Sequence, residues 1–252
     1  MSRQFLFSTI LVLSGIFSLT QNSQAQSISH TIWDELLQAH VTDEGIVDYT
    51  GFIKEKAKFE KYLNLLSNTP PQRSWKRTEQ LAYWINAYNA FTVKLIIDHY
   101  PIKSIKDIKR GVPFVNTVWD IKFIEIGGHK YDLNKIEHGI LRKRFKEPRI
   151  HFAVNCASAS CPPLLNHAYG GDKIYTQLNQ QAKRFLADTS KNKISTSKTQ
   201  LSKIFKWFKK DFTKDGSLKD FIAQYAPASF NKNAKISFLK YDWRLNNKKY
   251  LD

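Results

Sequence analysis

Hydrophobic residues recur at helical spacing along most of the chain after residue 30. The spacing predicts helices over residues 32–39, 52–66, 79–99, 133–145, 172–186 and 218–225. In the helix over 79–99, apolar side chains surround the axis on nearly every side, as is typical of a buried central helix. We expect Thr78 to cap it and Pro101 to end it.

Shorter apolar runs between these helices predict strands. They cover residues 114–119, 121–126, 129–133, 150–154 and 234–243, with Gly127 and Gly128 as a hairpin turn and a second hairpin through Ile194 and Leu201. Residues 201–212 combine apolar residues at helical spacing with lysines, and we interpret them as a core helix rather than a membrane-surface helix. The predicted fold class is α+β: a mostly helical body with its central buried helix packed on a small antiparallel sheet.

Polar residues interrupt two of the apolar faces. Asn86 and Asn89 lie one turn apart in the central helix, so their amides either tether neighbouring loops or line a polar site. Glu137 lies on the apolar face of the helix over 133–145, with His138 beside it. A carboxylate in this position needs a partner, for which Arg149 and His151 are the candidates, or it acts as an acid or base.

The first 25 residues have the pattern of a secretory signal peptide. Arg3 provides a positive charge, residues 5–19 are nearly all apolar, and the small residues Ser23 and Ala25 suit the positions before a cleavage point. We therefore expect cleavage after Ala25, a single globular domain over residues 26–252, and a periplasmic or extracellular location.

The formal net charge of +17 changes the expected partners. Outside the cytosol, a basic protein meets anionic envelope or cell-surface polymers rather than genomic DNA, so we expect no nucleic-acid partner. No later segment is apolar enough to span a bilayer, so the cleaved chain is not expected to be membrane-spanning.

Cys156 and Cys161 are the only cysteines, and they have three interpretations. In an oxidising compartment they form a disulfide. As free thiols, one is a nucleophile of the papain or transglutaminase kind, which needs a base. If residues 150–154 form a strand, His151 and Cys156 point to opposite faces, roughly 16 Å apart, so His138 or His167 suits Cys156 better and His151 suits Cys161.

The third interpretation is a metal or redox site built from Cys156, Cys161 and one or two of His138, His151 and His167, or a redox dithiol. The spacing lacks the second ligand pair of a usual zinc site, and it is not C-x-x-C. Phosphate-binding, zinc-protease, serine-nucleophile and dinucleotide motifs are missing from the sequence. We expect no cofactor and no bound metal.

Four separated motifs resemble the family catalogued as domain of unknown function 547. They are Tyr83–Ala90, Ile136–Arg142, Asn155–Ser158 with Cys161–Pro162, and Trp207 with Asp211–Phe212, and the resemblance extends from about Val47 to Asn246. It implies a compact α+β domain with the asparagine helix and the cysteine loop as signatures. It implies no activity.

The candidate site lies where the asparagine helix, the Glu137–His138 helix and the cysteine loop would meet. One hypothesis is a cysteine-dependent hydrolase or acyl transferase, with Cys156 or Cys161 as nucleophile, His138 or His151 as base, and Asn86 or Asn89 as orienting group or oxyanion donor. Glu137 is a further candidate acid or base. The competing hypothesis is a non-catalytic envelope-binding module with a Cys156–Cys161 disulfide and a basic surface.

Overall fold

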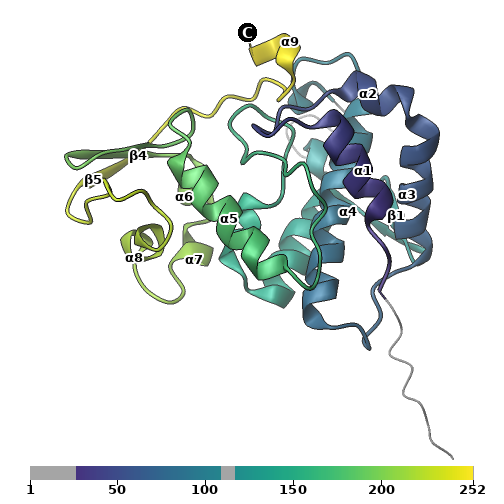
Figure 1. Cartoon of the computed structure of the whole chain (residues 1–252), viewed down its shortest axis with the longest axis horizontal. Helices are drawn as coiled ribbons and strands as arrows, with labels where there is room; N and C mark the ends of the chain where they lie inside the picture. Colours follow the sequence, from purple (N-terminus) through teal and green to yellow (C-terminus); the bar gives the residue numbers. More distant parts are fainter. Residues whose placement is uncertain (1–26, 109–116, 252) are drawn as a thin grey trace, which may run out of the picture.

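The computed structural model describes residues 27–108 and 117–251. The predicted signal peptide and residues 114–116 of the first predicted strand lie outside the described residues. The helices (Figure 1) are α1 (Thr31–His40), α2 (Tyr49–Lys54), α3 (Lys56–Asn68), α4 (Arg77–Ile97), α5 (Ile174–Ala187), α6 (Ile204–Trp207), α7 (Lys209–Phe212), α8 (Leu218–Ala223) and α9 (Lys248–Leu251). The strands are β1 (Ile124–Ile126), β2 (His129–Tyr131), β3 (Lys193–Ile194), β4 (Lys198–Leu201) and β5 (Lys235–Phe238).

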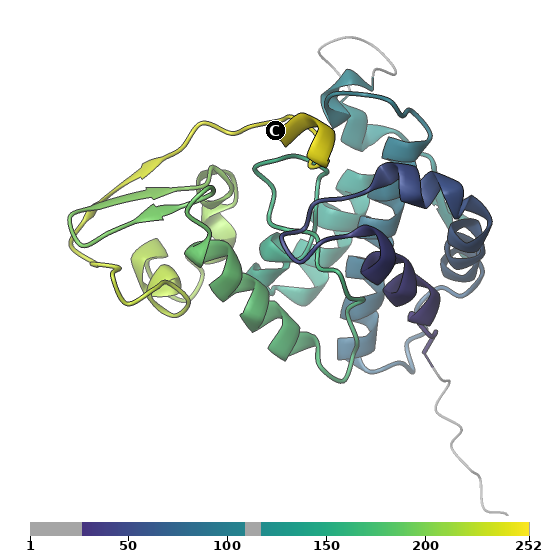
Figure 2. The ribbon, with the colours of Figure 1, turned by 45° about the horizontal axis from the view of Figure 1, so that its top comes forward.

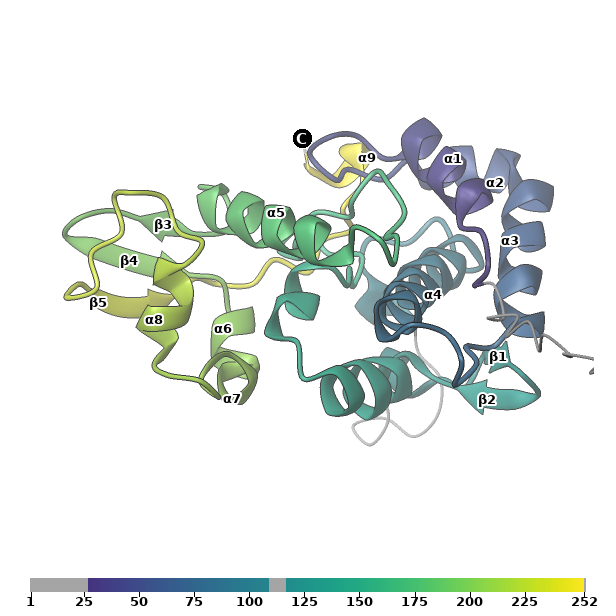
Figure 3. The same cartoon turned by 60° about the horizontal axis from the view of Figure 1, so that its bottom comes forward.

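Helix α4 is the buried centre of the larger hydrophobic cluster, as the sequence predicts. Its residues from Leu81 to Val93 are all buried, and α2 and α3 pack against it, with α1 packed on α2 and α3 (Figure 3). The predicted N-cap is wrong by two residues, because Glu79 accepts the backbone N–H of Lys76 through Oε2 at 2.8 Å and thereby starts the helix at Arg77. The predicted helix over 52–66 is divided into α2 and α3 at Glu55.

The predicted helix over 133–145 is present, and most of it, Lys135–Phe145, is wound as a π-helix. Asp132 caps it by accepting the Lys135 N–H at 2.6 Å. Hydrogen bonds in a π-helix join residues five apart, so Glu137 and Arg142 come to one side of the helix. Ile136, Glu137, Ile140 and Leu141 are buried, which confirms the predicted apolar face with its carboxylate.

The strands form two separate sheets rather than one. β1 and β2 make the predicted antiparallel hairpin, turned by Gly127 and Gly128 with φ of 60° and 74°. The other sheet has the order β3-β4-β5, with β3 and β4 antiparallel and β4 and β5 parallel. The α+β class is confirmed, but the sheet next to the central helix is only the small β1–β2 hairpin.

Two of the predicted strands, over residues 114–119 and 150–154, are wrong in the parts that the structure describes. Val118–Asp120 is a 3₁₀ helix, in which the Asp120 carboxylate accepts the Thr117 N–H at 2.8 Å. Pro148–Phe152 is also a 3₁₀ helix, because Pro148 favours a helix start and Glu147 accepts the Arg149 N–H at 3.1 Å. These caps compete successfully with the strand preference of the apolar residues.

A second hydrophobic cluster is built mainly from phenylalanine side chains. Phe152 lies at its centre with its ring 5.4–6.2 Å from the rings of Phe185, Phe205, Phe212 and Phe221. The predicted core helix over 201–212 is divided into β4, α6 and α7, but Ile204, Phe205 and Phe212 face this cluster as expected. Within residues 27–108 and 117–251, no helix is long and apolar enough to cross a membrane.

After β5, the chain runs back across the molecule to α9 as an extended strap, residues 239–247 (Figure 2). The strap lies against the cysteine loop, where Ala159 N–H donates to Arg244 O at 2.7 Å and Asn246 N–H donates to Ala157 O at 3.2 Å. It then reaches the first cluster, because Val47 N–H donates to Asn246 O at 2.9 Å. The strap therefore connects the cysteine loop to β5 at one end and to the first hydrophobic cluster, near Val47 and α9, at the other.

The second cluster generates a stability prediction. Phe152→Ala should lower the free energy of unfolding by about 3–5 kcal/mol, because it opens a cavity among four rings. Urea denaturation followed by circular dichroism measures the change. Tyr175→Ala is the matched control, since Tyr175 is 47% exposed and its removal should cost less than about 1 kcal/mol. Equal losses in the two variants would contradict the assignment of Phe152 to the core.

Candidate functional site

The three elements that the sequence singled out meet at one pocket. Tyr88 from α4, Glu137 and His138 from the π-helix, and both cysteines line a cavity of about 210 Å³. The 3₁₀ helix Pro148–Phe152 contributes His151. Aromatic side chains complete the wall: Trp119, Trp207, Phe208, Tyr241 and Trp243. We call this cavity the aromatic pocket.

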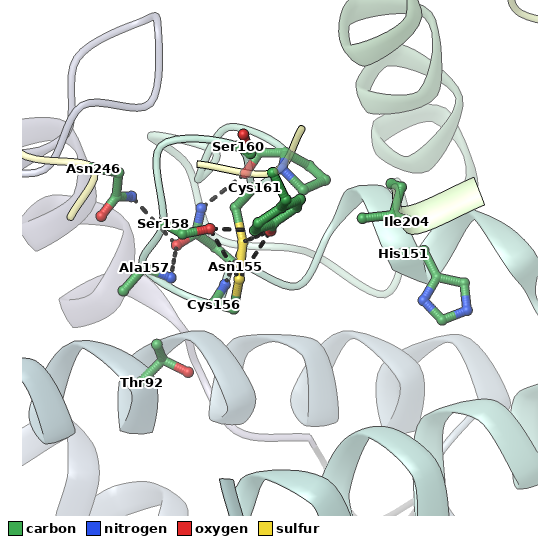
Figure 4. Close-up of a disulfide and its surroundings, with 12 residues drawn as sticks. Thr92, His151, Asn155, Cys156, Ala157, Ser158, Ser160, Cys161, Ile204 and Asn246 are labelled. Carbon is green, nitrogen blue, oxygen red and sulfur yellow. Dashed lines mark hydrogen bonds between the residues drawn. A yellow bond between two sulfur atoms is a disulfide. The ribbon is translucent and has the colours of Figure 1, made fainter. Parts of the chain in front are cut away.

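Cys156 and Cys161 form a disulfide, with their Cα atoms 6.2 Å apart (Figure 4). The two sulfurs have different surroundings. Cys161 is buried, with 4% of its surface exposed, whereas Cys156 is only half-buried. Cys161 Sγ accepts the Cys156 N–H at 2.9 Å. The Tyr241 hydroxyl lies 3.3 Å from both sulfurs, and Ser158 Oγ lies 3.3 Å from Cys156 Sγ. Ser158 Oγ donates in turn to the Tyr241 oxygen at 3.0 Å.

Asn155 holds the cysteine loop from within. Its Oδ1 accepts the Ala157 N–H at 2.8 Å, and its Nδ2 donates to Pro162 O at 2.8 Å, beyond the second cysteine. Ala157 adopts φ of 60°, a left-handed conformation that costs a non-glycine residue energy and persists because these contacts fix it. Asn246 of the strap donates to the same Oδ1 at 3.3 Å (Figure 4).

Asn86 and Asn89 tie the central helix to two loops. Asn86 donates to Tyr169 O at 2.8 Å and accepts the Tyr169 N–H at 3.0 Å. Asn89 donates to Ala153 O at 2.9 Å and accepts the Asn155 N–H at 2.9 Å. Both amides are thus engaged by backbone groups on both sides, which supports the tethering interpretation.

Glu137 has a buried carboxyl group at the pocket. Tyr88 donates its hydroxyl to Oε2 at 3.2 Å, and Oε1 lies 3.9 Å from His151 Nδ1. Burial raises the pKa of Glu137 to about 7, although the Tyr88 hydrogen bond and the Arg142 charge oppose the rise. Arg149, one of the two expected partners, instead pairs with Glu147, so His151 is the nearer of the two candidates.

His151 is fixed on one side only. Its Nε2 lies 2.8 Å from Asp211 Oδ2, and its ring stacks on Phe208 with centroids 3.9 Å apart. Asp211 also accepts from Arg142 Nε at 2.5 Å, and these two neighbours hold the pKa of its carboxyl well below the usual range despite burial. A carboxylate at Nε2 means that Nε2 carries the proton. The buried Nδ1 is then an acceptor without a hydrogen-bond partner.

Burial lowers the pKa of His151 to about 4, although Asp211 favours the charged form. The imidazole is therefore a weak base near neutral pH. The sequence predicted that His151 and Cys156 point to opposite faces of a strand. Residues 150–152 are helical instead, so this prediction is wrong, and both side chains line the same pocket. Figure 4 nevertheless shows the imidazole turned away from the disulfide.

The remaining histidines differ in position. His138 lines the pocket, with Nδ1 3.2 Å from an Arg142 guanidinium nitrogen, and burial and Arg142 lower its pKa. His167 pairs with Asp34 of α1 at 3.3 Å and is not among the pocket residues. In the described part of the chain, no histidine is hydrogen-bonded to either sulfur, and no cluster of three or more histidine, cysteine, aspartate or glutamate side chains would hold a metal ion.

Sequence reasoning missed the aromatic wall and the role of Tyr241. Trp207, Tyr241 and Trp243 contact one another with ring centroids 4.5–5.9 Å apart, and Trp119 stands 5.6 Å from Trp243. Trp207 is 46% exposed. The one signal in the sequence was the tryptophan–aspartate motif at 207–211, but nothing there placed it against the cysteines.

The model of the family described as "Protein of unknown function, DUF547" matches residues 72–186. This confirms the resemblance over the segment that holds α4, the π-helix and the cysteine loop. No curated protein and no solved structure matches the chain.

Glu137 generates a prediction about pH and stability. Its pKa is about 7 in the folded protein and about 4.5 unfolded, so the folded state binds more protons between these values. Its contribution to stability therefore falls as pH rises from about 4.5 to about 7. The free energy of unfolding of the wild type minus that of Glu137→Gln should fall by about 3 kcal/mol across this window.

Urea denaturation at a series of pH values measures this difference. The wild type alone would not show the effect clearly, because the lowered pKa of His151 makes its own contribution to stability rise with pH. Subtracting the free energy of unfolding of Glu137→Gln removes this contribution, which both proteins share. Glu125→Gln, at an exposed position in β1, is the control and should show a flat difference. A flat difference for Glu137→Gln as well would show that the carboxyl is not perturbed.

Proposed function

We propose that this chain, through its DUF547 domain, carries out thiol–disulfide exchange in the aromatic pocket. The Cys156–Cys161 disulfide accepts two electrons from thiols that enter the pocket. The observation that carries this proposal is a disulfide in the wall of a pocket, within a loop that hydrogen bonds hold independently of the disulfide.

The disulfide contributes little to the shape of its own loop. Asn155 bridges from Ala157 to Pro162, Cys161 N–H donates to Ser158 O at 3.0 Å, and the strap pairs with the outer edge. The stabilisation expected from a disulfide is also smaller when the closed loop is shorter, and here the cysteines are only five positions apart. Reduction should therefore leave the two sulfurs close together, as a reversible dithiol requires.

The surroundings of the sulfurs give the reaction a direction. The better leaving sulfur is the one whose thiolate is stabilised. Cys161 Sγ accepts the backbone N–H of Cys156 at 2.9 Å, and this donor distinguishes it from Cys156 Sγ. The Tyr241 hydroxyl lies 3.3 Å from both sulfurs and can stabilise either thiolate. Burial raises the pKa of Tyr241, so its hydroxyl stays protonated and able to donate. Cys156, which is half-buried at the pocket, is then the sulfur that is attacked.

In the first step, a substrate thiolate attacks Cys156 Sγ. A bond forms between the substrate sulfur and Cys156, the bond between Cys156 and Cys161 breaks, and the electron pair goes to Cys161 Sγ. The second thiolate of the same substrate dithiol then attacks the substrate sulfur of the mixed disulfide. A bond forms between the two substrate sulfurs, the bond to Cys156 breaks, and Cys156 leaves as a thiolate. The substrate dithiol is oxidised to a disulfide, and the protein disulfide is reduced to a dithiol.

Glu137 is the group that accepts the proton of the incoming thiol. Its pKa of about 7 leaves a substantial fraction ionised at neutral pH, and it lines the same pocket as Cys156. A general base works best when its pKa lies near the working pH. His151, with a pKa of about 4, is a weaker proton acceptor.

Export to an oxidising compartment, which the predicted signal peptide favours, agrees with a disulfide as the resting state. The cysteine-dependent hydrolase hypothesis requires a free thiol, and in the structure both sulfurs are bonded to each other. The binding-module hypothesis agrees with the disulfide but gives it only a shape-fixing purpose, which the Asn155 contacts already serve.

The central test is stoichiometric electron transfer. The oxidised protein, mixed anaerobically with a reduced Cys-Gly-Pro-Cys peptide, should convert one peptide to its disulfide per protein molecule, measured by reversed-phase chromatography after acid quenching. With a single-cysteine peptide, the trapped mixed disulfide should map to Cys156 by mass spectrometry. Cys156→Ser and Cys161→Ser should oxidise no peptide. A wild-type rate no higher than that in protein-free buffer would refute the proposal.

The proton acceptor gives a second, pH-dependent expectation. Glu137→Gln should slow exchange with 2-mercaptoethanol about tenfold at pH 7, where the thiol is protonated. The effect should disappear above the pKa of that thiol, because a thiolate in solution needs no base. Glu125→Gln should match the wild type at every pH. If Glu137→Gln slows exchange by the same factor above the pKa of the thiol as at pH 7, Glu137 has a structural role instead.

A further inference from the structure

A groove with a basic lining adjoins the aromatic pocket. Lys103, Ser104, Lys240, Tyr241, Asp242, Trp243 and Arg244 line it. Tyr241 and Trp243 also line the aromatic pocket, so the two hollows share a wall. The Tyr241 hydroxyl lies 3.3 Å from both sulfurs of the disulfide. A chain that lies in this groove is therefore adjacent to the disulfide.

Positive charge dominates this groove. Lys103 and Lys240 are exposed, and Lys106 lies 4.8 Å above the ring of Trp243. The two carboxylates nearby are already engaged. Asp242 pairs with Arg244 at 2.8 Å, and Asp107 accepts the backbone N–H groups of Lys103 and Ser104 at 3.1 and 2.9 Å.

We propose that the groove binds an acidic polypeptide segment and that this segment carries the thiol. Carboxylates of the segment lie along Lys103, Lys106 and Lys240, and its cysteine enters the aromatic pocket toward Cys156. The inference rests on the proposed thiol–disulfide exchange and names its substrate class. Charge complementarity and the shared wall support it, and the formal net charge of +17 attracts such a partner over longer range.

An acidic polysaccharide would satisfy the same charges, but it carries no thiol. The groove and the aromatic pocket share a wall. This arrangement is useful to the proposed exchange only if the chain bound in the groove also reaches the disulfide. A polypeptide with acidic residues beside a cysteine has both properties.

The test compares three single-cysteine peptides, in which the cysteine has two aspartates, two asparagines or two lysines on each side. The rate of loss of the protein disulfide is measured for each and divided by the concentration of peptide thiolate, because neighbouring charges change the pKa of a thiol. At low salt, the aspartate peptide should react about tenfold faster than the asparagine peptide. The lysine peptide should be the slowest. The differences should shrink at 0.5 M salt, where charges are screened over a few ångströms.

The double variant Lys103→Gln/Lys240→Gln should lose most of the preference for the aspartate peptide while keeping the wild-type rate with uncharged 2-mercaptoethanol. The matched control is Lys54→Gln/Lys61→Gln, which removes two exposed lysines of α2 and α3 and should keep the preference. Equal rates for all three peptides, with exchange intact, would overturn this inference alone. Exchange with none of the thiols would instead overturn the proposed function.

Polygalacturonate separates the two kinds of acidic partner. If it binds the wild type but not the Lys103→Gln/Lys240→Gln variant, and the aspartate peptide has no rate advantage, the groove serves a polysaccharide and the inference is wrong. If it only competes with the aspartate peptide and lowers that peptide's advantage, the inference stands.

Discussion

The amide pairs of Asn86 and Asn89 with the backbone are the contacts on which the site depends. Both asparagines extend from the buried central helix, and each meets a loop with one donor and one acceptor. An unpaired amide in this position would cost about 1–3 kcal/mol for each polar group left unsatisfied, so the two loops are held in register with the helix. Asn155, whose N–H is bound by Asn89, then holds the cysteine loop in shape through its own side chain.

Burial sets opposite protonation behaviour in two neighbouring groups of the pocket. The same desolvation raises the pKa of Glu137 and lowers that of His151, because it penalises the charged form of each. Asp211 remains ionised because Arg142 and His151 both contact it. The result is a neutral imidazole, a carboxyl group that titrates near neutral pH, and a fixed ion pair behind them, which is an arrangement suited to moving a single proton.

The two cysteines are equivalent in the sequence, and the fold makes them different. The strap that returns from β5 brings the Tyr241 hydroxyl to within 3.3 Å of both sulfurs, and the Cys156 N–H donates to Cys161 Sγ. Cys161 Sγ therefore has the backbone donor and Cys156 has the greater exposure, and the proposed exchange depends on this difference. The same strap carries Trp243 and Arg244, so the proposed exchange and the proposed peptide groove both involve one segment of chain.

The sequence by itself determined the features that follow from local periodicity and from the cost of burying polar groups. These include the central helix, the hairpin at Gly127–Gly128, the carboxylate on the apolar face at Glu137, and the need of the buried Asn86 and Asn89 amides for hydrogen-bond partners. Only the tertiary structure decided the rest. The strap crosses about 80 residues of sequence to reach the cysteine loop, and no local pattern records that contact. Likewise, the helical turn at Pro148–Phe152 and the position of Asp211 beside His151 depend on caps and distant partners, which periodicity does not encode.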